Sequence, residues 1–383
     1  MKTLAILGST GSIGLNALEV IRSFPGKFKV AALSTNSNIE LLARQVKEFK
    51  PLSVCVGDPV SANKIKGSLG KTKLLIGKEG LALIAAMPQV EEVLLATSGA
   101  SALIPLLEAV RNGKQIALAN KEAMVMAGPI VMEAARRNNA KIIPVDSEQS
   151  AIWQCLEGED NRKVRRIYLT ASGGPFRKVS KKAMRTASLG RVLEHPRWKM
   201  GRKITVDSAT LMNKGLELLE AMFLFDTELE NIEILIHPQA IIHSMVEFVD
   251  GVILAQLSAT DMRIPIQYAL SYPDRLPNRL ARVDFYRLEE LSFERPDYGK
   301  FPCLGLAYKA AKKLGTAPCV LNAANEISVD EFLKGRISFS SIPDVIEKVL
   351  SRHRGKEKPA LRDILEADAW ARKMAAEVIT SLN

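Results

Sequence analysis

A glycine run near the first residue constrains the fold of this chain more than any other feature. Thr3–Leu7 has the pattern of a buried strand, and Gly8-Ser-Thr-Gly11-Ser-Ile-Gly14 follows it directly. Leu15–Ile21 then continues as a predicted helix. Glycines at such a turn let backbone N–H groups approach a pyrophosphate at the helix N-terminus, where the helix dipole favours negative charge. A structural turn is the alternative, but the place of this run between a strand and a helix favours a dinucleotide site.

Short apolar runs alternate with amphipathic stretches over residues 1–145. This alternation is typical of βαβ units around a parallel sheet. We therefore predict an α/β, doubly wound, dinucleotide-binding domain over residues 1–145. Its predicted strands are Thr3–Leu7, Lys29–Leu33, Ser53–Val56, Glu92–Ala96, Gln115–Leu118 and Lys141–Val145, and its predicted helices are Asn16–Ser23, Asn38–Phe49, Gly80–Met87 and Ala102–Asn112.

The pattern changes after residue 145, where apolar strands are no longer followed by regular crossover helices. We predict a central, mixed α/β catalytic domain at 146–271, with a partly antiparallel sheet made of Arg166–Thr170, Ile232–Ile236, Met245–Val249 and Val252–Gln256. A polar, proline-punctuated linker follows at 272–300. Residues 301–383 predict a C-terminal helical bundle with helices Cys303–Leu314, Ala323–Leu333, Ile342–Arg352 and Leu361–Leu382.

The chain has 383 residues and a formal net charge of +11, which suits anionic partners. Its basic residues are spread along the chain, so we expect the phosphates of small molecules as partners and no nucleic acid. The cysteines, Cys55, Cys155, Cys303 and Cys319, form no close pair, which favours a reduced, cytoplasmic setting. No apolar stretch is long enough to cross a bilayer, so we expect no membrane association.

The end of the second predicted strand bears on the choice between NAD and NADP. NAD-binding domains usually place an acidic residue there to hold the ribose 2′-hydroxyl. This chain has Leu33-Ser-Thr-Asn-Ser-Asn38 instead, and the first acidic residue is Glu40. A carboxylate would repel a 2′-phosphate, whereas hydroxyl, amide and backbone N–H groups can bind it. We therefore expect NADPH.

Three carboxylates predict a metal site. Asp146 and Glu148 follow a predicted strand, and strand alternation would point both to the same side. Glu217 borders the apolar stripe of a predicted helix and can face inward, whereas Glu220 is expected at the surface. Oxygen ligands without cysteine or clustered histidine suit Mg²⁺ or Mn²⁺ rather than structural zinc. An Asp-x-Glu pair at a strand end is otherwise a common turn, and spacing alone does not bring Glu217 to it.

A set of motifs occurs in order from residue 3 to the C-terminal helices. They are Gly8-Ser-Thr-Gly-Ser-Ile-Gly14, Ala119-Asn-Lys-Glu122, Val145-Asp-Ser-Glu148, Ala171-Ser-Gly-Gly-Pro-Phe176, His195-Pro-Arg-Trp-Lys-Met-Gly-Arg-Lys203, Val206-Asp-Ser-Ala-Thr210, Met212-Asn-Lys-Gly-Leu-Glu217, Ile236-His-Pro-Gln239, Ile242-His-Ser-Met245 and Leu321-Asn-Ala-Ala-Asn-Glu326. With these motifs the chain resembles the 1-deoxy-D-xylulose 5-phosphate reductoisomerases. That family isomerises its substrate and reduces it with NADPH to 2-C-methyl-D-erythritol 4-phosphate in the non-mevalonate isoprenoid pathway.

The resemblance implies a set of residues for the metal and the substrate. Asp146, Glu148 and Glu217 would ligate one divalent ion (Mg, Mn or Co), which bridges two oxygens of the sugar phosphate. The substrate phosphate would be held by Ser172, His195, Ser208, Asn213 and Lys214, and the reacting end would lie near Lys121 and Ser147. Trp198 belongs to a stretch at about 191–203 that resembles the family's mobile lid, which excludes water from the reaction.

The same resemblance implies the contacts to NADPH. They come from Thr10, Gly11, Ser12, Ile13, Asn36, Ser37, Asn38, Asn120, Glu122 and Gly201. Several relatives have Gly-Lys-Asn where this chain has Asn36-Ser37-Asn38, so the grip on the 2′-phosphate is a point of departure from the family. The family also implies a homodimer.

Two functions of other kinds remain open at this stage. A semialdehyde dehydrogenase also pairs a glycine loop with a mixed second domain, and it needs a nucleophilic cysteine, for which Cys155 is the candidate. An NADP-sensing regulator or a nucleic-acid binder would use the positive charge without catalysis.

Overall fold

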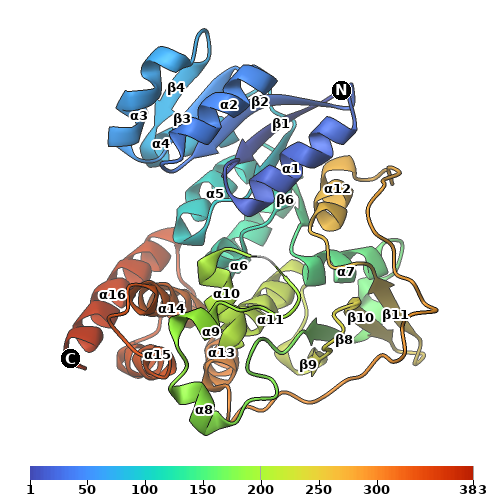
Figure 1. Cartoon of the computed structure of the whole chain (residues 1–383), viewed down its shortest axis with the longest axis vertical. Helices are drawn as coiled ribbons and strands as arrows, with labels where there is room; N and C mark the ends of the chain where they lie inside the picture. The colour runs from blue at the N-terminus through green and yellow to red at the C-terminus, as the bar shows by residue number, and fades with distance from the viewer. Residues whose placement is uncertain (199, 383) are drawn as a thin grey trace. The chain divides into compact units, whose positions relative to one another are not determined.

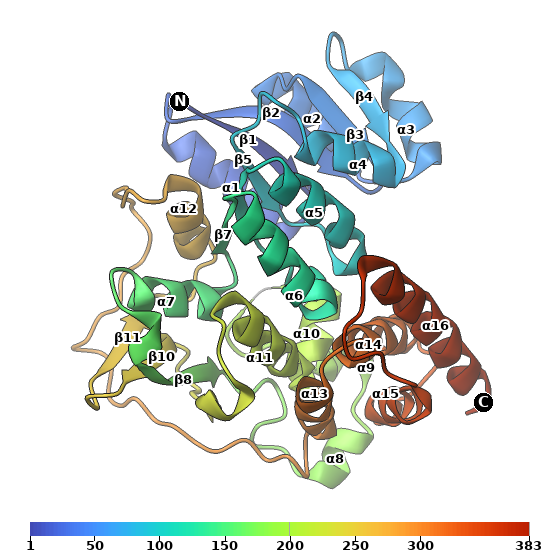
Figure 2. The ribbon, with the colours of Figure 1, turned by 180° about the vertical axis from the view of Figure 1, so that it is seen from behind.

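The computed structural model describes residues 1–198 and 200–382, and its contacts divide the chain into two compact units. The first unit comprises Met1–Ala123, Pro129–Ser150 and Asp261–Leu280, and the second comprises Met124–Gly128, Ala151–Thr260 and Ala281–Asn383. Figures 1 and 2 show the elements of each unit from opposite sides. These units are defined by the contacts within them and not by function. The domain boundaries that the sequence predicts therefore stay predictions.

A seven-stranded sheet in the order β4-β3-β2-β1-β5-β6-β7 forms the centre of the first unit, and all its strand pairs are parallel. The strands are β1 (Lys2–Leu7), β2 (Phe28–Thr35), β3 (Ser53–Val56), β4 (Lys73–Ile76), β5 (Glu92–Leu95), β6 (Gln115–Leu118) and β7 (Lys141–Pro144). The predicted α/β class is confirmed. The strand order reverses between β1 and β5, and ligands of such sheets bind at the carboxyl ends of the strands at this point.

Helices follow most of these strands and cover the sheet. They are α1 (Ser12–Ser23), α2 (Ile39–Phe49), α3 (Pro59–Ile65), α4 (Gly77–Ala85), α5 (Leu103–Arg111) and α6 (Lys121–Arg137), with short 3-10 turns at Lys66–Ser68 and Gly99–Ala102. The sequence did not predict β4, α3 or α6. β4 is a partly exposed edge strand, and Pro129 interrupts the pattern of α6, whose backbone leaves helical geometry at Ala127.

Helix α12 (Arg263–Ser271) belongs to the first unit although it lies far along the chain. It packs against α1, β6 and β7, and Lys2 Nζ holds its C-terminal end by donating to the Leu270 carbonyl at 2.8 Å. The range predicted for the catalytic domain, 146–271, therefore contributes a helix to the nucleotide-binding sheet. An amphipathic pattern does not say which sheet a helix packs on, because the partner surface is distant in sequence.

A mixed four-stranded sheet in the order β11-β10-β8-β9 lies in the second unit. β8 (Val164–Ala171) pairs parallel with β9 (Ile232–Ile236) and antiparallel with β10 (Ile242–Phe248), which pairs antiparallel with β11 (Ile253–Leu257). The prediction of a partly antiparallel sheet is confirmed. Residues 272–300, all of which are described, form no helix, and Glu294 makes an isolated antiparallel bridge to Ile236.

Helices make up the rest of the second unit. They are α7 (Ser147–Leu156), which starts in the first unit, α8 (Lys181–Arg185), α9 (Leu189–Val192), α10 (Arg202–Ala209), α11 (Met212–Leu224), α13 (Pro302–Lys313), α14 (Ala317–Leu333), α15 (Ser341–Arg352) and α16 (Leu361–Thr380), with 3-10 turns at Asn161–Lys163 and Leu229–Asn231. One buried apolar cluster joins β8, β9 and α11 to α13–α16. The predicted C-terminal bundle thus shares its core with β8, β9 and α11. None of the helices in the described residues combines the length and apolarity needed to cross a membrane.

Candidate active site

The glycine run lies between β1 and α1, and its glycines serve different purposes. Gly8 has a φ of +91°, and a Cβ there would lie 2.5 Å from the carbonyl oxygen of Ala96. A Cβ at Gly14, on α1, would lie 2.3 Å from the oxygen of Gly8. At Gly11 the nearest atom is 3.4 Å away, and no side chain caps the helix that follows. Gly8 therefore lets the turn approach the backbone after β5, Gly14 lets the helix pack closely on the turn, and Gly11 leaves room for a pyrophosphate.

The loop after β2 carries the residues predicted to bind the 2′-phosphate. Asn36, Ser37 and Asn38 are all exposed at the N-terminus of α2. The Asn38 side chain accepts the N–H of Leu41 at 3.3 Å, and its backbone N–H donates to Thr35 Oγ1 at 3.3 Å. The positive end of the α2 dipole and the exposed amide and hydroxyl groups suit an anion, although the loop carries no cationic side chain.

Gln45 is a residue that the sequence reasoning missed. It is buried on α2, its Nε2 donates to the Ser9 carbonyl at 2.9 Å, and its Oε1 accepts the Ser9 hydroxyl at 2.7 Å. Gln45 therefore fixes the first turn of the glycine loop. The available signal was a lone amide between Leu42 and Val46 on the apolar face of an amphipathic helix.

Asn120 holds a neighbouring loop at the carboxyl end of β5. Its Oδ1 caps α6 by accepting the Ala123 N–H at 2.8 Å, and its Nδ2 donates to the carbonyls of Thr97 at 2.7 Å and Gly99 at 3.1 Å. The side chain is buried and both ends of its amide are used. Asn120 thus fixes the loop of Thr97 and Gly99 at the carboxyl end of β5, and Glu122 is buried on the same helix.

The sequence predicted that Asp146 and Glu148 lie on the same side of an extended strand. In the structure they do not lie on a strand. β7 ends at Pro144 and α7 begins at Ser147, and the Asp146 carbonyl accepts the Ser150 N–H at 2.8 Å. The strand-alternation argument was therefore wrong. Asp146 takes the position that starts a helix, for which Asp is a favoured residue, and Glu148 belongs to the first turn, where acidic residues suit the helix dipole.

Both of these carboxylates have partners in the first unit. Lys121 Nζ forms an ion pair with the Asp146 carboxylate, and Lys121 is almost completely buried. Ser147 Oγ donates to Glu148 Oε2 at 2.6 Å. The predicted residues Lys121 and Ser147 thus contact the predicted metal ligands directly.

Glu217 is buried on α11, as its predicted inward orientation requires, and is held by its own helix. Asn213 Nδ2 donates to Glu217 Oε1 and Lys214 Nζ to Glu217 Oε2, because residues three and four apart share one helix face. Glu220, expected at the surface, is instead only 1% exposed. Helix α11 is covered by α10, α13, β8 and β9, so it buries more than the one stripe that its pattern indicates.

The three predicted carboxylates form a group that could hold a metal ion. One ligand oxygen from each of Asp146, Glu148 and Glu217 lies within 4.8 Å of the others, and among the described residues this is the one such group of His, Cys, Asp and Glu. All of its donors are hard oxygen atoms. The donor set therefore fits Mg²⁺ or Mn²⁺ and does not fit a structural zinc site.

Ser172 and His195 form a hydrogen-bonded pair in the second unit. His195 Nδ1 accepts the backbone N–H groups of Arg197 at 3.2 Å and Trp198 at 2.9 Å, so the ring proton lies on Nε2, which donates to Ser172 Oγ at 3.2 Å. Desolvation by burial lowers the pKa of His195 to about 4, so the ring is neutral near pH 7. Ser172 Oγ also accepts the Gly174 N–H at 3.3 Å, which leaves the hydroxyl proton to donate to an anion.

Gly174 connects this pair to Ser208 on α10. Gly174 has a φ of +66°, and a Cβ there would lie 2.7 Å from the Ser208 carbonyl oxygen. Only glycine suits this position, since both the backbone conformation and the close approach exclude a side chain. The turn Ser172-Gly173-Gly174 and the Ser208 segment are thereby in direct contact, as the predicted phosphate site requires.

The predicted lid, about 191–203, includes Lys199, which lies outside the described residues, and Trp198 and Gly201 on either side of it have defined contacts. Trp198 lies with its ring centroid 6.2 Å from that of His243, which is buried and bonded to the Ser258 carbonyl at 3.3 Å. Gly201 is the N-cap of α10, and its carbonyl accepts the Thr205 N–H at 3.1 Å. The sequence reasoning left His243 out of the site, and the structure places it beside the lid tryptophan.

The cysteines offer no nucleophile. All four are free and buried. Desolvation raises the pKa of Cys155 to about 11 and the pKa of Cys303 to about 12, so neither holds a thiolate at neutral pH. The semialdehyde dehydrogenase alternative, which needs Cys155 as its nucleophile, therefore has no support in the structure.

Comparisons with known proteins identify one and the same family along the chain. The model of the 1-deoxy-D-xylulose 5-phosphate reductoisomerase family matches residues 4–128, and models of its C-terminal domains match residues 142–225 and 257–374. The reductoisomerase of Thermodesulfovibrio yellowstonii is 48% identical over 379 residues, which cover 99% of this chain and 100% of that protein. The reductoisomerase of Ruminiclostridium cellulolyticum is 50% identical over 380 residues, 99% of each chain.

Solved structures of 1-deoxy-D-xylulose 5-phosphate reductoisomerases are also similar to the structure of this chain. A crystal structure of DOX-P reductoisomerase in complex with NADPH, fosmidomycin and magnesium has a TM-score of 0.94 and 41% identity, and the match covers 100% of this chain and 99% of that one. The Zymomonas mobilis enzyme in complex with NADPH has a TM-score of 0.91 and 41% identity, with 99% of both chains covered. Identity at this level over the full length, with matching family models, shows that the chain belongs to the 1-deoxy-D-xylulose 5-phosphate reductoisomerase family.

Proposed function

We propose that this chain catalyses the isomerisation and NADPH-dependent reduction of 1-deoxy-D-xylulose 5-phosphate to 2-C-methyl-D-erythritol 4-phosphate, with a divalent metal, in the non-mevalonate isoprenoid pathway. Family membership and the grouping of Asp146, Glu148 and Glu217 support the same reaction. The carboxylate group is the observation that carries the proposal, because a dinucleotide fold alone would suit many dehydrogenases.

Asp146, Glu148 and Glu217 would hold one Mg²⁺, Mn²⁺ or Co²⁺ ion, for which their oxygen donors fit. Such an ion, when bound, polarises a carbonyl and stabilises negative charge on the substrate oxygens. Lys121 places a positive charge beside Asp146, where it can stabilise a developing oxyanion. Ser147 orients Glu148 through its hydrogen bond.

The substrate phosphate is assigned to donors from three segments of the second unit. Ser172 offers a hydroxyl proton, and neutral His195 offers its Nε2 proton, which now points to Ser172. Ser208 contributes a hydroxyl from α10, and Asn213 and Lys214 contribute an amide and an ammonium from the first turn of α11. His195 now donates to Ser172, and Asn213 and Lys214 now donate to Glu217, so a bound phosphate would take over part of these hydrogen bonds as charge-assisted ones.

Trp198 and Gly201 are assigned to the closing lid and Gly11 to the pyrophosphate. Trp198, backed by His243, would cover the bound substrate and exclude water that competes for the reactive intermediate. Thr10, Gly11, Ser12 and Ile13 would bind the pyrophosphate of NADPH at the start of α1. Asn36, Ser37 and Asn38 would bind the 2′-phosphate, and Asn120 and Glu122 would contribute at the start of α6.

We further propose that the protein is a cytoplasmic homodimer. The family resemblance supports the dimer, and the reduced, unpaired cysteines suit a reducing compartment. Sedimentation at several protein concentrations tests the first part, and localisation of a tagged protein tests the second.

Metal binding to the carboxylate variants tests the assignment. We expect Mn²⁺ titration calorimetry to give a single site, lost in Glu217→Gln and Asp146→Asn and kept in Glu247→Gln. Glu247 is a suitable control because its carboxylate is bonded to Tyr168 and paired with Arg165 and is not a member of the three-carboxylate group. Retained Mn²⁺ binding in Glu217→Gln would refute the ligand set. In turnover assays, EDTA should abolish activity and thiol alkylation should not, which is the reverse of a cysteine-dependent dehydrogenase.

A further inference from the structure

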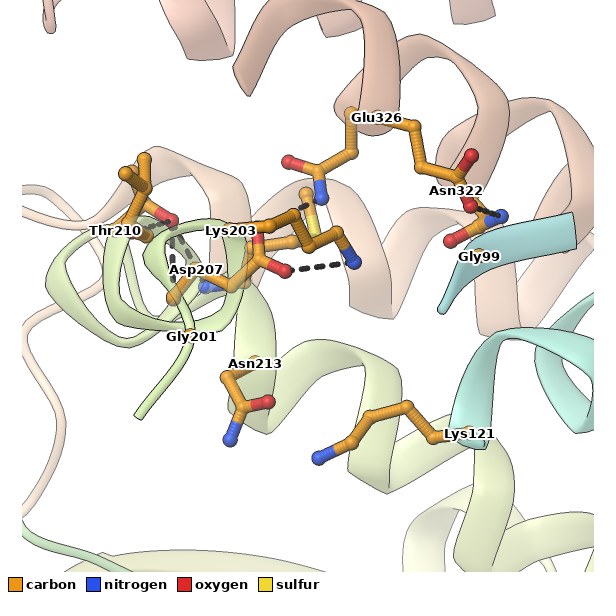
Figure 3. A network of polar contacts seen from close by, with 12 residues as sticks. Gly99, Lys121, Gly201, Lys203, Asp207, Thr210, Asn213, Asn322 and Glu326 are labelled. Atoms are coloured by element: carbon orange, nitrogen blue, oxygen red, sulfur yellow. Dashed lines mark hydrogen bonds and ion pairs between the residues drawn. The ribbon is translucent and has the colours of Figure 1, made fainter. Parts of the chain in front are cut away.

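The motif Leu321-Asn-Ala-Ala-Asn-Glu326 has no role in the site described above, although it is one of the ordered motifs of the chain. It lies on α14, where Asn322 and Asn325 are both completely buried. Buried amides are costly unless hydrogen-bonded, so their partners show what they do. Figure 3 shows the network around this helix.

Asn325 contacts α10 through a buried carboxylate. Its Nδ2 donates to Asp207 Oδ1 at 2.8 Å, and Asp207 is 1% exposed. The other Asp207 oxygen, Oδ2, accepts Lys203 Nζ at 2.9 Å, one turn earlier on α10 (Figure 3). Asp207 thus joins α14 to the start of α10, immediately after the lid.

On its other side α14 is tied to α16. Asn322 Nδ2 donates to Glu326 Oε1 at 2.9 Å (Figure 3), and Arg372 Nη2 on α16 donates to Glu326 Oε2 at 2.7 Å. Asp368 also pairs with Arg372 at 2.8 Å. A continuous series of polar contacts therefore holds α14 against the last helix, and α14 in turn holds α10.

Stability alone does not account for this arrangement. Within the described residues, Oδ1 of Asn325 and Oδ1 of Asn322 have no hydrogen-bond partner, and both atoms are buried. Apolar side chains of similar volume in place of both partners, Asn325 and Asp207, would avoid that cost. The amide of Asn325 is instead oriented by Asp207, since only Nδ2 can donate to a carboxylate.

We propose that Asn325 is a positioning residue for the substrate phosphate site. Through Asp207 it fixes α10, and α10 carries Ser208 next to Asp207. The turn that follows is also fixed by this segment, because Thr210 Oγ1 donates to the Asp207 carbonyl at 3.1 Å and accepts the Met212 N–H at 3.2 Å at the start of α11. The inference rests on the proposed function, since it assumes that Ser208 and the first turn of α11 bind the phosphate.

Asn325→Leu and Ser328→Ala form a matched pair for the test. Ser328 is equally buried on α14, but its hydroxyl donates only to Ala324 within the helix. We expect Asn325→Leu to raise the KM for 1-deoxy-D-xylulose 5-phosphate and the inhibition constant of inorganic phosphate by about tenfold, which is the effect of a small misplacement of binding groups. The KM for NADPH should not change, and Ser328→Ala should match the wild type in all three constants.

Asn325→Asp tests the contact in a variant of the same shape. A carboxylate facing Asp207 must repel it or share a proton with it, so the KM penalty should shrink as the pH falls. If Asn325 had a structural role alone, Asn325→Asp would lower the thermal midpoint, and its KM for the substrate would not depend on pH in this way. Equal phosphate inhibition constants in Asn325→Leu and Ser328→Ala, or a pH-independent KM in Asn325→Asp, would overturn the proposal. Absence of turnover by the wild type would instead count against the proposed function.

Discussion

Replacement of Gly174 by alanine separates backbone strain from displacement of the phosphate site. Gly174 has a φ of +66°, and an alanine in this region costs about 1–2 kcal/mol. Its Cβ would also lie 2.7 Å from the Ser208 carbonyl oxygen, so either the turn or α10 must shift. Gly251, in the turn between β10 and β11, has a φ of +85°, and a Cβ there would meet no atom within 4 Å, so Gly251→Ala carries the strain without the contact.

We expect both variants to lose similar stability in chemical denaturation and to differ in kinetics. A displacement of Ser208 or Ser172 by a fraction of an ångström should lower kcat/KM for 1-deoxy-D-xylulose 5-phosphate by about 10- to 100-fold in Gly174→Ala, or about 1.4–2.7 kcal/mol. Gly251→Ala should keep kcat/KM near that of the wild type. Steady-state assays at saturating NADPH give the comparison. Equal kcat/KM in the two variants would refute the view that Gly174 sets the place of Ser208.

Three further predictions concern a buried carboxylate and a helix cap in the first unit, and one hydroxyl of the proposed phosphate site. Desolvation raises the pKa of buried Glu92 to about 7 from an ordinary value of 4.5, although Lys2 Nζ lies 2.8 Å from its carboxylate. Between pH 4.5 and 7 the folded state therefore keeps a proton on Glu92 that the unfolded state loses. The stability of the folded state falls as the pH rises through this range. Urea denaturation should show a loss of about 3 kcal/mol over that range, and Glu92→Gln should remove this slope. Asn120→Ala should lower stability by about 1 kcal/mol through loss of the helix cap and raise the KM for NADPH, and an unchanged KM for NADPH would count against its role in the cofactor site. Ser172→Ala should raise the KM for the phosphorylated substrate by about tenfold through loss of one donor to an anion. The helix-capping Ser180→Ala is the control for that variant, and a rise in KM in both would point to a general loss of structure.

Much of the fold follows from local pattern. The strands β3, β6 and β9 have the bounds that the sequence predicts, because each is a short, mainly apolar run between turn residues. β4 was missed because an edge strand of mixed polarity lacks such a run. α12 shows the second limit, since its packing on the first sheet depends on contacts that are distant in sequence.

The site residues divide in the same way. Glycines at Gly8 and Gly14 could be identified because turns and close packing leave a direct mark on the sequence. Asp146 and Glu148 were identified from an expected strand, whereas they lie at the start of a helix. Acidic residues at i and i+2 can reach one site from either structure, so the residues were the same although the reason was wrong. Gln45 acts by fixing another residue, and such roles become visible only when the hydrogen bonds are known.

Turnover of 1-deoxy-D-xylulose 5-phosphate tests the central claim most directly. The purified protein is mixed with this substrate, NADPH and Mn²⁺, and the nicotinamide absorbance is followed while the product is identified by mass spectrometry. We expect NADPH oxidation that requires both the sugar phosphate and the metal, that yields 2-C-methyl-D-erythritol 4-phosphate, and that is lost in Glu217→Gln. No metal-dependent oxidation of NADPH by the wild-type protein, or undiminished oxidation by Glu217→Gln, would contradict the account.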